Sequence, residues 1–301
     1  MKILFNLHKT GLANNGGSRT LIKSAETLAN LGEEVYIYSP VNNYTWHDVQ
    51  RNVHICKEVV PPCDVAIATT PKNVDHTMAL NAKRKFYYIR GYEVFWCPKE
   101  LVHSSYRKIP CIVNSEWLQG LLAKLGVESK IVYPGLDMDL WKDLGQARNT
   151  DLGGLHSSKH PTKRHHDIIN VSQGLSMLLL NRDIKNPSPK RQVEFYNDIK
   201  VWMAPTELEG LHNPPMEASL CGCALVCTNH KRSGMSDYAI PGETALVYPA
   251  RNLGTAKDMI RSLLGNEAER AKLVSNMKAL LSEKISDRKK NMKKLLEIIG
   301  G

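Results

Sequence analysis

Several features that would place the chain in other protein classes are missing from its sequence. No run of eighteen apolar residues is present, so no membrane-spanning helix is expected. The apolar stretch from Ile3 to Leu7 is too short for a signal-peptide core and is typical of a first buried strand. We find no internal repeat and no low-complexity segment. These absences together predict a globular protein of the cytoplasm.

Cysteine is sparse and irregularly placed. The chain has seven cysteines, an odd number, and two of them, Cys221 and Cys223, stand in the sequence CGC. That spacing fits neither a zinc site nor a thioredoxin motif. We therefore expect reduced thiols that are buried or half-buried.

The chain is long and carries a positive net charge. Its 301 residues are enough for two domains, and 42% of them are hydrophobic, which suits a folded core. The formal net charge of +10 is distributed over both halves. Such a charge favours an anionic partner, such as a nucleotide phosphate, a membrane surface or a nucleic acid, or it serves solubility alone.

Short apolar runs alternate with amphipathic ones along the chain, which is typical of βαβ units and parallel sheets. Strands are predicted at 2–7, 34–40, 64–71, 84–91, 111–115, 130–135, 152–158, 176–181, 200–205 and 223–229. Helices are predicted at 20–32, 115–126, 163–175 and 214–222, with long helical periodicity over 255–300.

The polar segment 135–151 separates these elements into two halves. We predict an α/β protein of two facing Rossmann-like domains with a cleft between them. The first domain covers 1–145, and the second covers 146–301 with a C-terminal helical segment. Ligands of open α/β sheets bind beyond the carboxyl ends of the strands, where the strand order reverses. The loops expected to line the cleft are therefore 8–19, 69–76, 90–97, 156–163, 206–215 and 229–237.

The most unusual loop leads into a helix that starts with two prolines. Pro214 and Pro215 suit a first helical turn, whose free N–H groups and dipole favour an anion such as a diphosphate. We place Glu217 in that first turn, where its carboxylate either accepts from a ribose diol or simply stabilises the helix dipole. Gly210 permits close approach of a ligand, and Glu209 is expected at the loop tip, facing the cleft.

Residues 205–229, PTELEGLHNPPMEASLCGCALVCTN, resemble the signature of the family 4 retaining glycosyltransferases, which have the GT-B fold. Glu209 and Glu217 are separated by seven residues, as the two glutamates of that family are. Further matching stretches are GGS at 16–18, VNSEWLQGLL at 113–122, VYPGLDMDLW at 132–141 and KRHHDIINV at 163–171.

The resemblance implies a role for each matching position in a nucleotide-sugar donor site. Glu217 would bind the donor ribose, and Glu209 would contact the hydroxyls or the developing charge of the transferred sugar. Lys163 would bind the diphosphate and neutralise the leaving group. The other positions expected to bind the donor are Gly210, Asn213, Pro214 and Arg164 in the second domain, and Gly16 and Gly17 in the first.

The sequence departs from the family pattern in one respect. The family has an arginine ahead of the lysine, whereas the stretch before Lys163 contains none. His156, Lys159 or Arg164 would have to replace it. No Asp-x-Asp lies in a suitable loop, and the resemblance implies an enzyme without metal or cofactor, whose donor is a UDP-sugar by default.

The resemblance assigns the acceptor to the first domain, where two loops follow predicted strands. The residues expected to bind it are Thr70, His76, Arg90, Tyr92 and Glu93, although His76 is equally typical of a helix surface. The predicted activity is transfer of a sugar to a hydroxyl of a glycan, lipid-linked or small-molecule acceptor. One alternative is a phage-type glycosyltransferase that modifies hydroxylated bases in DNA, and another is a non-catalytic nucleotide-sugar-binding protein. Any membrane contact would be peripheral and electrostatic.

Overall fold

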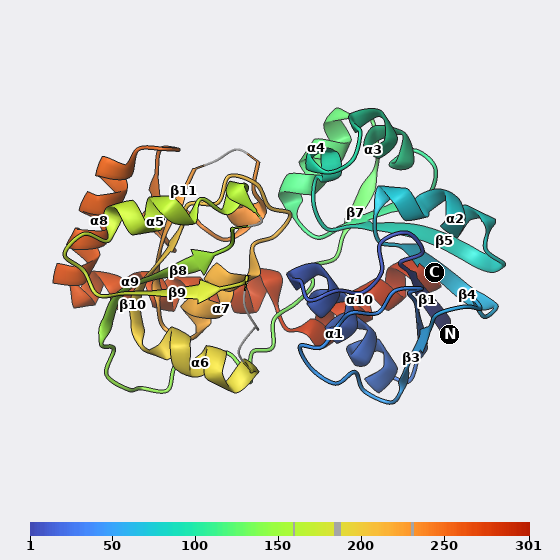
Figure 1. The fold of residues 1–301 in the computed structure, drawn as a ribbon, viewed down its shortest axis with the longest axis horizontal. Helices are drawn as coiled ribbons and strands as arrows, with labels where there is room; N and C mark the ends of the chain where they lie inside the picture. The colour runs from blue at the N-terminus through green and yellow to red at the C-terminus, as the bar shows by residue number, and fades with distance from the viewer. Residues whose placement is uncertain (159, 184–187, 230–231) are drawn as a thin grey trace. The chain divides into compact units, whose positions relative to one another are not determined.

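The chain folds into two compact units, each built on one parallel sheet (Figure 1). The computed structural model describes residues 1–158, 160–183, 188–229 and 232–301. The first unit comprises Met1–Gly135 together with Arg288–Gly301, and the second comprises Leu136–Asp287. The predicted α/β class with two Rossmann-like domains is confirmed.

The first unit has a seven-stranded sheet in the order β3-β2-β1-β4-β5-β6-β7. Its strands are β1 (Lys2–Asn6), β2 (Glu34–Tyr38), β3 (Val53–Cys56), β4 (Cys63–Ala68), β5 (Ala82–Ile89), β6 (Cys111–Val113) and β7 (Ser129–Ile131). Its helices are α1 (Gly16–Asn30), α2 (Val74–Ala79), α3 (Lys99–Ser105), α4 (Glu116–Lys124) and α10 (Arg288–Gly300). The strand order reverses between β1 and β4, which are direct neighbours.

Helices cover both faces of this sheet, which explains why its strands are apolar without alternation. Tyr88 packs in the core cluster that contains residues of α1 and α10. Its neighbours Tyr87 and Ile89 point to the opposite face and pack with residues of α3 and α4.

Helix α10 returns the chain to the first unit. Met292, Leu295 and Ile299 lie at helical spacing and are fully buried in the cluster that also holds residues of α1. The observed division therefore differs from the predicted domains 1–145 and 146–301, because the chain crosses after Gly135 and again before Arg288. Helical periodicity identifies the buried face of a helix but not the sheet that this face covers.

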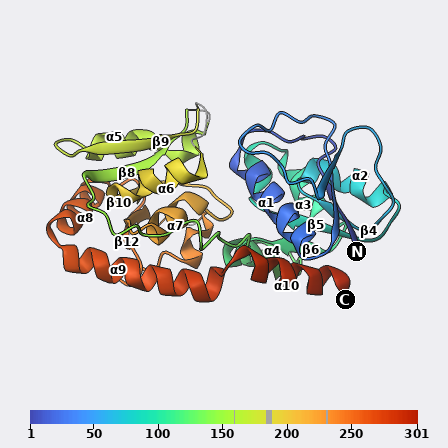
Figure 2. The same ribbon diagram turned by 90° about the horizontal axis from the view of Figure 1, so that it is seen from below.

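The second unit has a five-stranded parallel sheet in the order β12-β11-β10-β8-β9. Its strands are β8 (Thr150–His156), β9 (Met177–Asn181), β10 (Ile199–Ala204), β11 (Ala224–Thr228) and β12 (Leu246–Tyr248). Its helices are α5 (His165–Val171), α6 (Pro189–Asn197), α7 (Asn213–Leu220), α8 (Leu253–Gly265) and α9 (Glu267–Leu280), and α8 packs on α9 (Figure 2). The order reverses between β8 and β10, so a ligand site is expected at their carboxyl ends.

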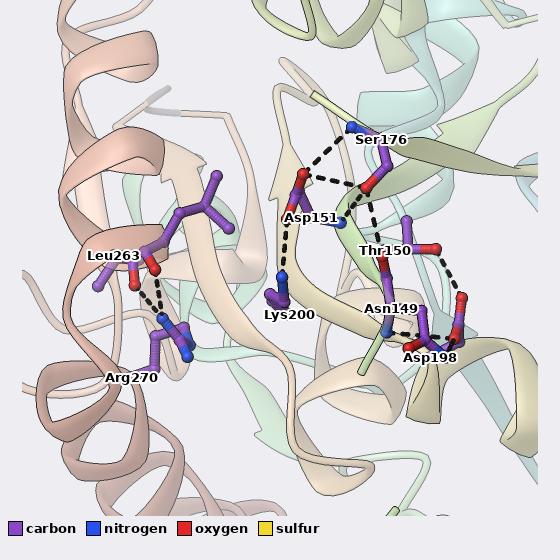
Figure 3. A network of polar contacts seen from close by, with 9 residues as sticks. Asn149, Thr150, Asp151, Ser176, Asp198, Lys200, Leu263 and Arg270 are labelled. Atoms are coloured by element: carbon purple, nitrogen blue, oxygen red, sulfur yellow. Dashed lines mark hydrogen bonds and ion pairs between the residues drawn. The ribbon is translucent and has the colours of Figure 1, made fainter. Parts of the chain in front are cut away.

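The opposite ends of the same strands are joined by a polar network (Figure 3). Asp151 accepts hydrogen bonds from Lys200 Nζ (2.9 Å) and from Ser176 Oγ (3.0 Å). Thr150 Oγ1 donates to Asp198 at 2.6 Å. These side-chain hydrogen bonds link the amino ends of β8, β9 and β10 to one another.

All seven cysteines are free thiols, six of them buried and Cys56 partly exposed, as predicted. Within the described part of the chain, no helix has the length and apolar character that crossing a membrane requires.

Candidate functional site

The loops after β8 and β10 bring Lys163, Glu209 and His212 together. Lys163 Nζ forms an ion pair with Glu209 Oε1, and His212 Nε2 lies 3.8 Å from the same oxygen. The backbone of Glu209 is fixed by the loop after β11, because its N–H donates to Arg232 O (3.2 Å) and its C=O accepts from Gly234 N–H (3.2 Å). The two residues predicted as catalytic are therefore neighbours.

The pKa of Lys163 lies close to neutral pH. Its side chain is 16% exposed, and that of Glu209 is 21% exposed. Burial and, to a smaller extent, the charge of Arg182 lower the pKa of Lys163 to about 7. The carboxylate of Glu209 acts in the opposite direction. An anionic ligand at this position would hold Lys163 in its charged form.

Arg164, predicted to bind the donor, is instead held by carboxylates of its own unit. It ends the 3₁₀ turn Pro161–Lys163 in a left-handed conformation, with φ of 51°. Its guanidinium donates to both oxygens of Asp167, at 2.6 and 2.9 Å, and lies 3.3 Å from Glu207. The sequence spacing explains this, because Asp167 follows three residues later in the first turn of α5.

Arg182 is a functional candidate that we did not predict. It follows the last residue of β9, where its N–H donates to His156 O at 3.0 Å. Its charge lowers the pKa of both Lys163 and His212, so it lies within electrostatic range of both. Arg182 thus places a positive charge near Lys163, directly after the strand that neighbours β8.

The predicted substitutes for the arginine missing ahead of Lys163 are less well placed. His156 Nδ1 lies 3.2 Å from both Asn181 Oδ1 and Asp183 Oδ2. Arg164 is paired with Asp167 and Glu207. Lys159 lies outside the described residues. The rule that ligands bind beyond strand carboxyl ends, applied to the predicted strand 176–181, would have identified Arg182.

Helix α7 begins one residue earlier than predicted, with His212 as its N-cap. Asn213 and Pro214 are its first two residues, so their backbone lies at the predicted place. Glu217 consequently lies in the second turn, not in the first as we predicted. Its carboxylate is 5% exposed and accepts from Tyr196 Oη at 3.2 Å, so a residue of α6 orients it. Gly210 is buried in the loop between Glu209 and α7.

In the first unit, Gly16 and Gly17 form the first turn of α1 and are not part of a loop. The helix starts there because Asn15 Oδ1 accepts from Ser18 N–H at 2.8 Å. Arg90 Nη1 donates to Gly17 O at 2.6 Å. Arg90, which we predicted to bind the acceptor, therefore contacts the turn formed by Gly16 and Gly17, which we predicted to bind the donor.

Thr70 and His76 lie where the sheet order of the first unit reverses. His76 stacks on His8 with ring centroids 3.9 Å apart and planes at 6°, and its Nδ1 lies 2.9 Å from Asn6 Nδ2. Thr70 Oγ1 is buried and has no hydrogen-bond partner among the described residues. His8 and Asn6 were not predicted, although both stand at or just after the end of the first strand.

Tyr92 and Glu93 are directed into the first unit. Tyr92 Oη lies 2.9 Å from His103 Nε2 of α3. Glu93 is 4% exposed and accepts from Tyr87 Oη (2.9 Å) and Tyr106 Oη (3.0 Å). The geometry of Glu93 fits a buried structural group better than the predicted contact with an acceptor.

We expect Glu93 to make stability depend on pH. Burial raises the pKa of its carboxyl from 4.5 to about 7, which the two tyrosine hydrogen bonds only partly oppose. Between these values the folded chain keeps a proton that the unfolded chain has lost, so the free energy of unfolding falls as pH rises. Glu93→Gln should remove this loss, which amounts to roughly 3 kcal/mol between pH 4.5 and 8.

Urea unfolding at pH 5 and pH 8 measures the effect. The exposed neighbour Glu100 provides the control, since Glu100→Gln should leave the pH dependence of the wild type intact. Equal pH dependence in wild type and Glu93→Gln would show that Glu93 is not the titrating group.

Within residues 1–158, 160–183, 188–229 and 232–301, no group of three or more His, Cys, Asp or Glu side chains is arranged to hold a metal ion.

One protein family matches part of the chain. The family described as "Glycosyl transferases group 1" matches residues 184–280, less than half of the chain. That range contains Glu209, His212 and Glu217. No curated protein matches the chain.

Solved structures match the chain over nearly its whole length. Sucrose-phosphate synthase from Thermosynechococcus elongatus is 11% identical with a TM-score of 0.81, over 99% of this chain and 98% of that one. HepE of Anabaena in complex with UDP is 15% identical with a TM-score of 0.78, over 100% of both chains. WaaG, a glycosyltransferase involved in lipopolysaccharide biosynthesis, is 14% identical with a TM-score of 0.71, over 99% of this chain and 100% of that one. At these identities the likeness shows the fold alone, which is the GT-B fold.

Proposed function

We propose that the chain is a retaining glycosyltransferase that moves a sugar from a nucleotide-diphosphate sugar to a hydroxyl acceptor. The observation that carries this proposal is the grouping of Lys163, Arg182 and Glu209 at the carboxyl ends of adjacent parallel strands, beside the N-terminus of α7. The matched family and the GT-B fold support it.

The residue types suit the chemistry of this reaction. The bond between the anomeric carbon and a phosphate oxygen breaks, which leaves an anionic diphosphate and a sugar with positive charge developing at the anomeric carbon. Lys163, Arg182 and the N–H groups of the first turn of α7 would stabilise the leaving anion. Glu209 would face the sugar. Such a mechanism requires no metal, and we propose that the enzyme is metal-independent.

The geometry of α7 supports the remaining donor contacts that we propose. Glu217, held by Tyr196, would accept from the ribose hydroxyls, while the backbone of Asn213 and Pro214 would contact phosphate or sugar. Gly16 and Gly17 remain predicted to contact the diphosphate. The UDP and UDP-glucose named in the HepE structures support a UDP-sugar as the donor.

We assign the acceptor to the first unit, where Thr70, His76 and Arg90 are the residues that support a binding role. The acceptor class stays a glycan, a lipid-linked molecule or a small molecule, and the cytoplasm stays the predicted location. The alternative of a DNA acceptor has only the net charge of +10 in its favour. The non-catalytic alternative loses its single argument, the missing arginine, if Arg182 takes that role.

A thermal-shift panel of UDP, GDP, ADP and their sugars tests the proposal. A ligand that binds only the folded state at 100 times its Kd adds about 2.7 kcal/mol, which raises Tm by several degrees. We expect one nucleotide to stand out, and Glu217→Ala to reduce its shift because the ribose contact is lost.

Glu194→Ala, which changes an exposed glutamate of α6 in the same unit, is the matched control and should keep the full shift. Chromatography of the best nucleotide sugar after incubation then measures donor hydrolysis or transfer. Absence of any shift across the panel would contradict the proposed function.

A further inference from the structure

His212 is a buried histidine whose ring lacks hydrogen bonds. The residue is 2% exposed, and neither Nδ1 nor Nε2 has a hydrogen-bond partner among the described residues. Buried polar groups are almost always paired, because leaving one unpaired is costly. An unpaired buried side chain at the edge of a candidate site indicates a ligand that supplies the missing hydrogen bond.

The ring of His212 faces the reactive part of the site. Its Nε2 lies 3.8 Å from Glu209 Oε1, the oxygen that also pairs with Lys163. The backbone position is fixed, since His212 is the N-cap of α7 and its C=O accepts from Tyr238 Oη at 2.8 Å. The burial of the residue, 2% exposed, leaves the imidazole little room to turn away from Glu209.

The imidazole is neutral at ordinary pH. Burial, followed by the charges of Lys163 and Arg182, lowers the pKa of His212 well below its usual value. A neutral ring donates one hydrogen bond, whereas the Glu209 carboxylate only accepts. Together they offer one donor and one acceptor 3.8 Å apart.

A hydroxyl group is the chemical complement of this pair. Its oxygen can lie about 2.8 Å from both atoms, accept from the imidazole N–H and donate to the carboxylate. A phosphate oxygen has no proton to donate and would be repelled by Glu209. The pair therefore favours the sugar part of a nucleotide sugar over its phosphates.

We propose that His212 is a specificity-determining residue whose Nε2–H donates to a hydroxyl of the transferred sugar, the same hydroxyl that donates to Glu209. This inference rests on the proposed function and deepens it. The ligand class is a nucleotide sugar that keeps a free hydroxyl at this position. A donor deoxygenated there should be rejected, because the paired groups would again be left unsatisfied.

Calorimetric titration of UDP and of the nucleotide sugar selected by the thermal-shift panel tests this contact. His212→Ala should leave the Kd of the nucleotide alone within about twofold and raise the Kd of the nucleotide sugar about tenfold, the loss of one hydrogen bond. His212→Gln should recover most of the affinity, because its amide reaches the position of Nε2, whereas His212→Asn should not.

Ser219→Ala is the matched control. It removes another buried polar group without a described partner from the same helix, near the end remote from His212, and should change neither Kd. Nitrogen NMR of the wild type gives a second measurement that needs no variant. The signals of His212 should shift on adding the nucleotide sugar and stay unchanged on adding the nucleotide.

The outcomes separate this inference from the proposed function. If the wild type binds the nucleotide sugar but His212→Ala weakens nucleotide and nucleotide sugar equally, or weakens neither, the sugar contact is refuted and the proposed function stands. Unshifted His212 signals in the presence of bound nucleotide sugar would refute it as well. Failure of the wild type to bind any nucleotide sugar would overturn the proposed function itself.

Discussion

Replacing Lys163 with methionine is expected to lower kcat/KM for sugar transfer by about 10²- to 10³-fold, the typical effect of removing one group that stabilises developing charge. Methionine keeps the length of the side chain but removes the cation nearest to Glu209. Nucleotide affinity should fall about 10- to 100-fold, because a charge-assisted hydrogen bond to the diphosphate is lost. The residual activity would come from Arg182 and the N-terminus of α7.

The pH dependence of donor binding is expected to show whether Lys163 is the titrating group. Because the pKa of Lys163 is lowered to about 7 and the charged form binds anions, donor affinity should decline as pH rises through that value. A UDP-sugar is the suitable probe, since it lacks the terminal phosphate whose second pKa lies near 6. Lys163→Arg should bind with little pH dependence between 6 and 9, because a guanidinium stays charged throughout.

Two results would argue against this role. Donor affinity of the wild type that is constant from pH 6 to 9 would show that no group near pKa 7 contacts the donor. Unchanged nucleotide affinity in Lys163→Met, with a thermal unfolding curve showing that the variant is folded, would mean that Lys163 only balances the charge of Glu209. Lys200→Met is a matched control, because Lys200 pairs with Asp151 at the opposite ends of the strands.

The sequence was sufficient to predict most of the strands and the loops that carry the site. Parallel strands buried on both faces are apolar runs, so β1, β4, β8 and β10 were readily recognised. The carboxyl-end rule then placed Lys163 and Glu209 at one edge of a sheet, and the structure confirms that they are neighbours. Both steps depend only on local pattern and on a general property of parallel sheets.

Contacts between segments distant in sequence were not predictable in the same way. The burial of α10 against the first unit depends on tertiary packing, since its apolar spacing fits any sheet equally well. Glu93 followed a predicted strand and was expected to face a ligand, but Tyr106, thirteen residues away, draws its carboxylate into the core. Arg182 and His212 were not predicted because neither is a position that matches the family pattern. The electrostatic effect of Arg182 on Lys163 and the unpaired ring nitrogens of His212 depend on the folded structure.

Replacing Glu209 with alanine is expected to separate binding from catalysis. Transfer should fall by about 10²- to 10³-fold, because the carboxylate facing the sugar is lost. At a pH low enough to keep Lys163 charged, affinity for UDP should stay equal or increase, since Lys163 loses the ion pair that competes with a bound phosphate. The loss of this carboxylate also lowers the pKa of Lys163 further, so the pH at which donor affinity declines should move to lower values.

Glu209→Gln resolves how the carboxylate acts on the sugar. Glutamine still accepts a hydrogen bond from a sugar hydroxyl but carries no charge, so it should restore the affinity for the nucleotide sugar and leave kcat low if Glu209 stabilises developing positive charge. Recovery of kcat in Glu209→Gln would instead mean that Glu209 only positions the sugar. Full activity of Glu209→Ala would contradict both roles, and it would leave the close pair of Lys163 and Glu209 as a structural ion pair beside a reaction centre located elsewhere.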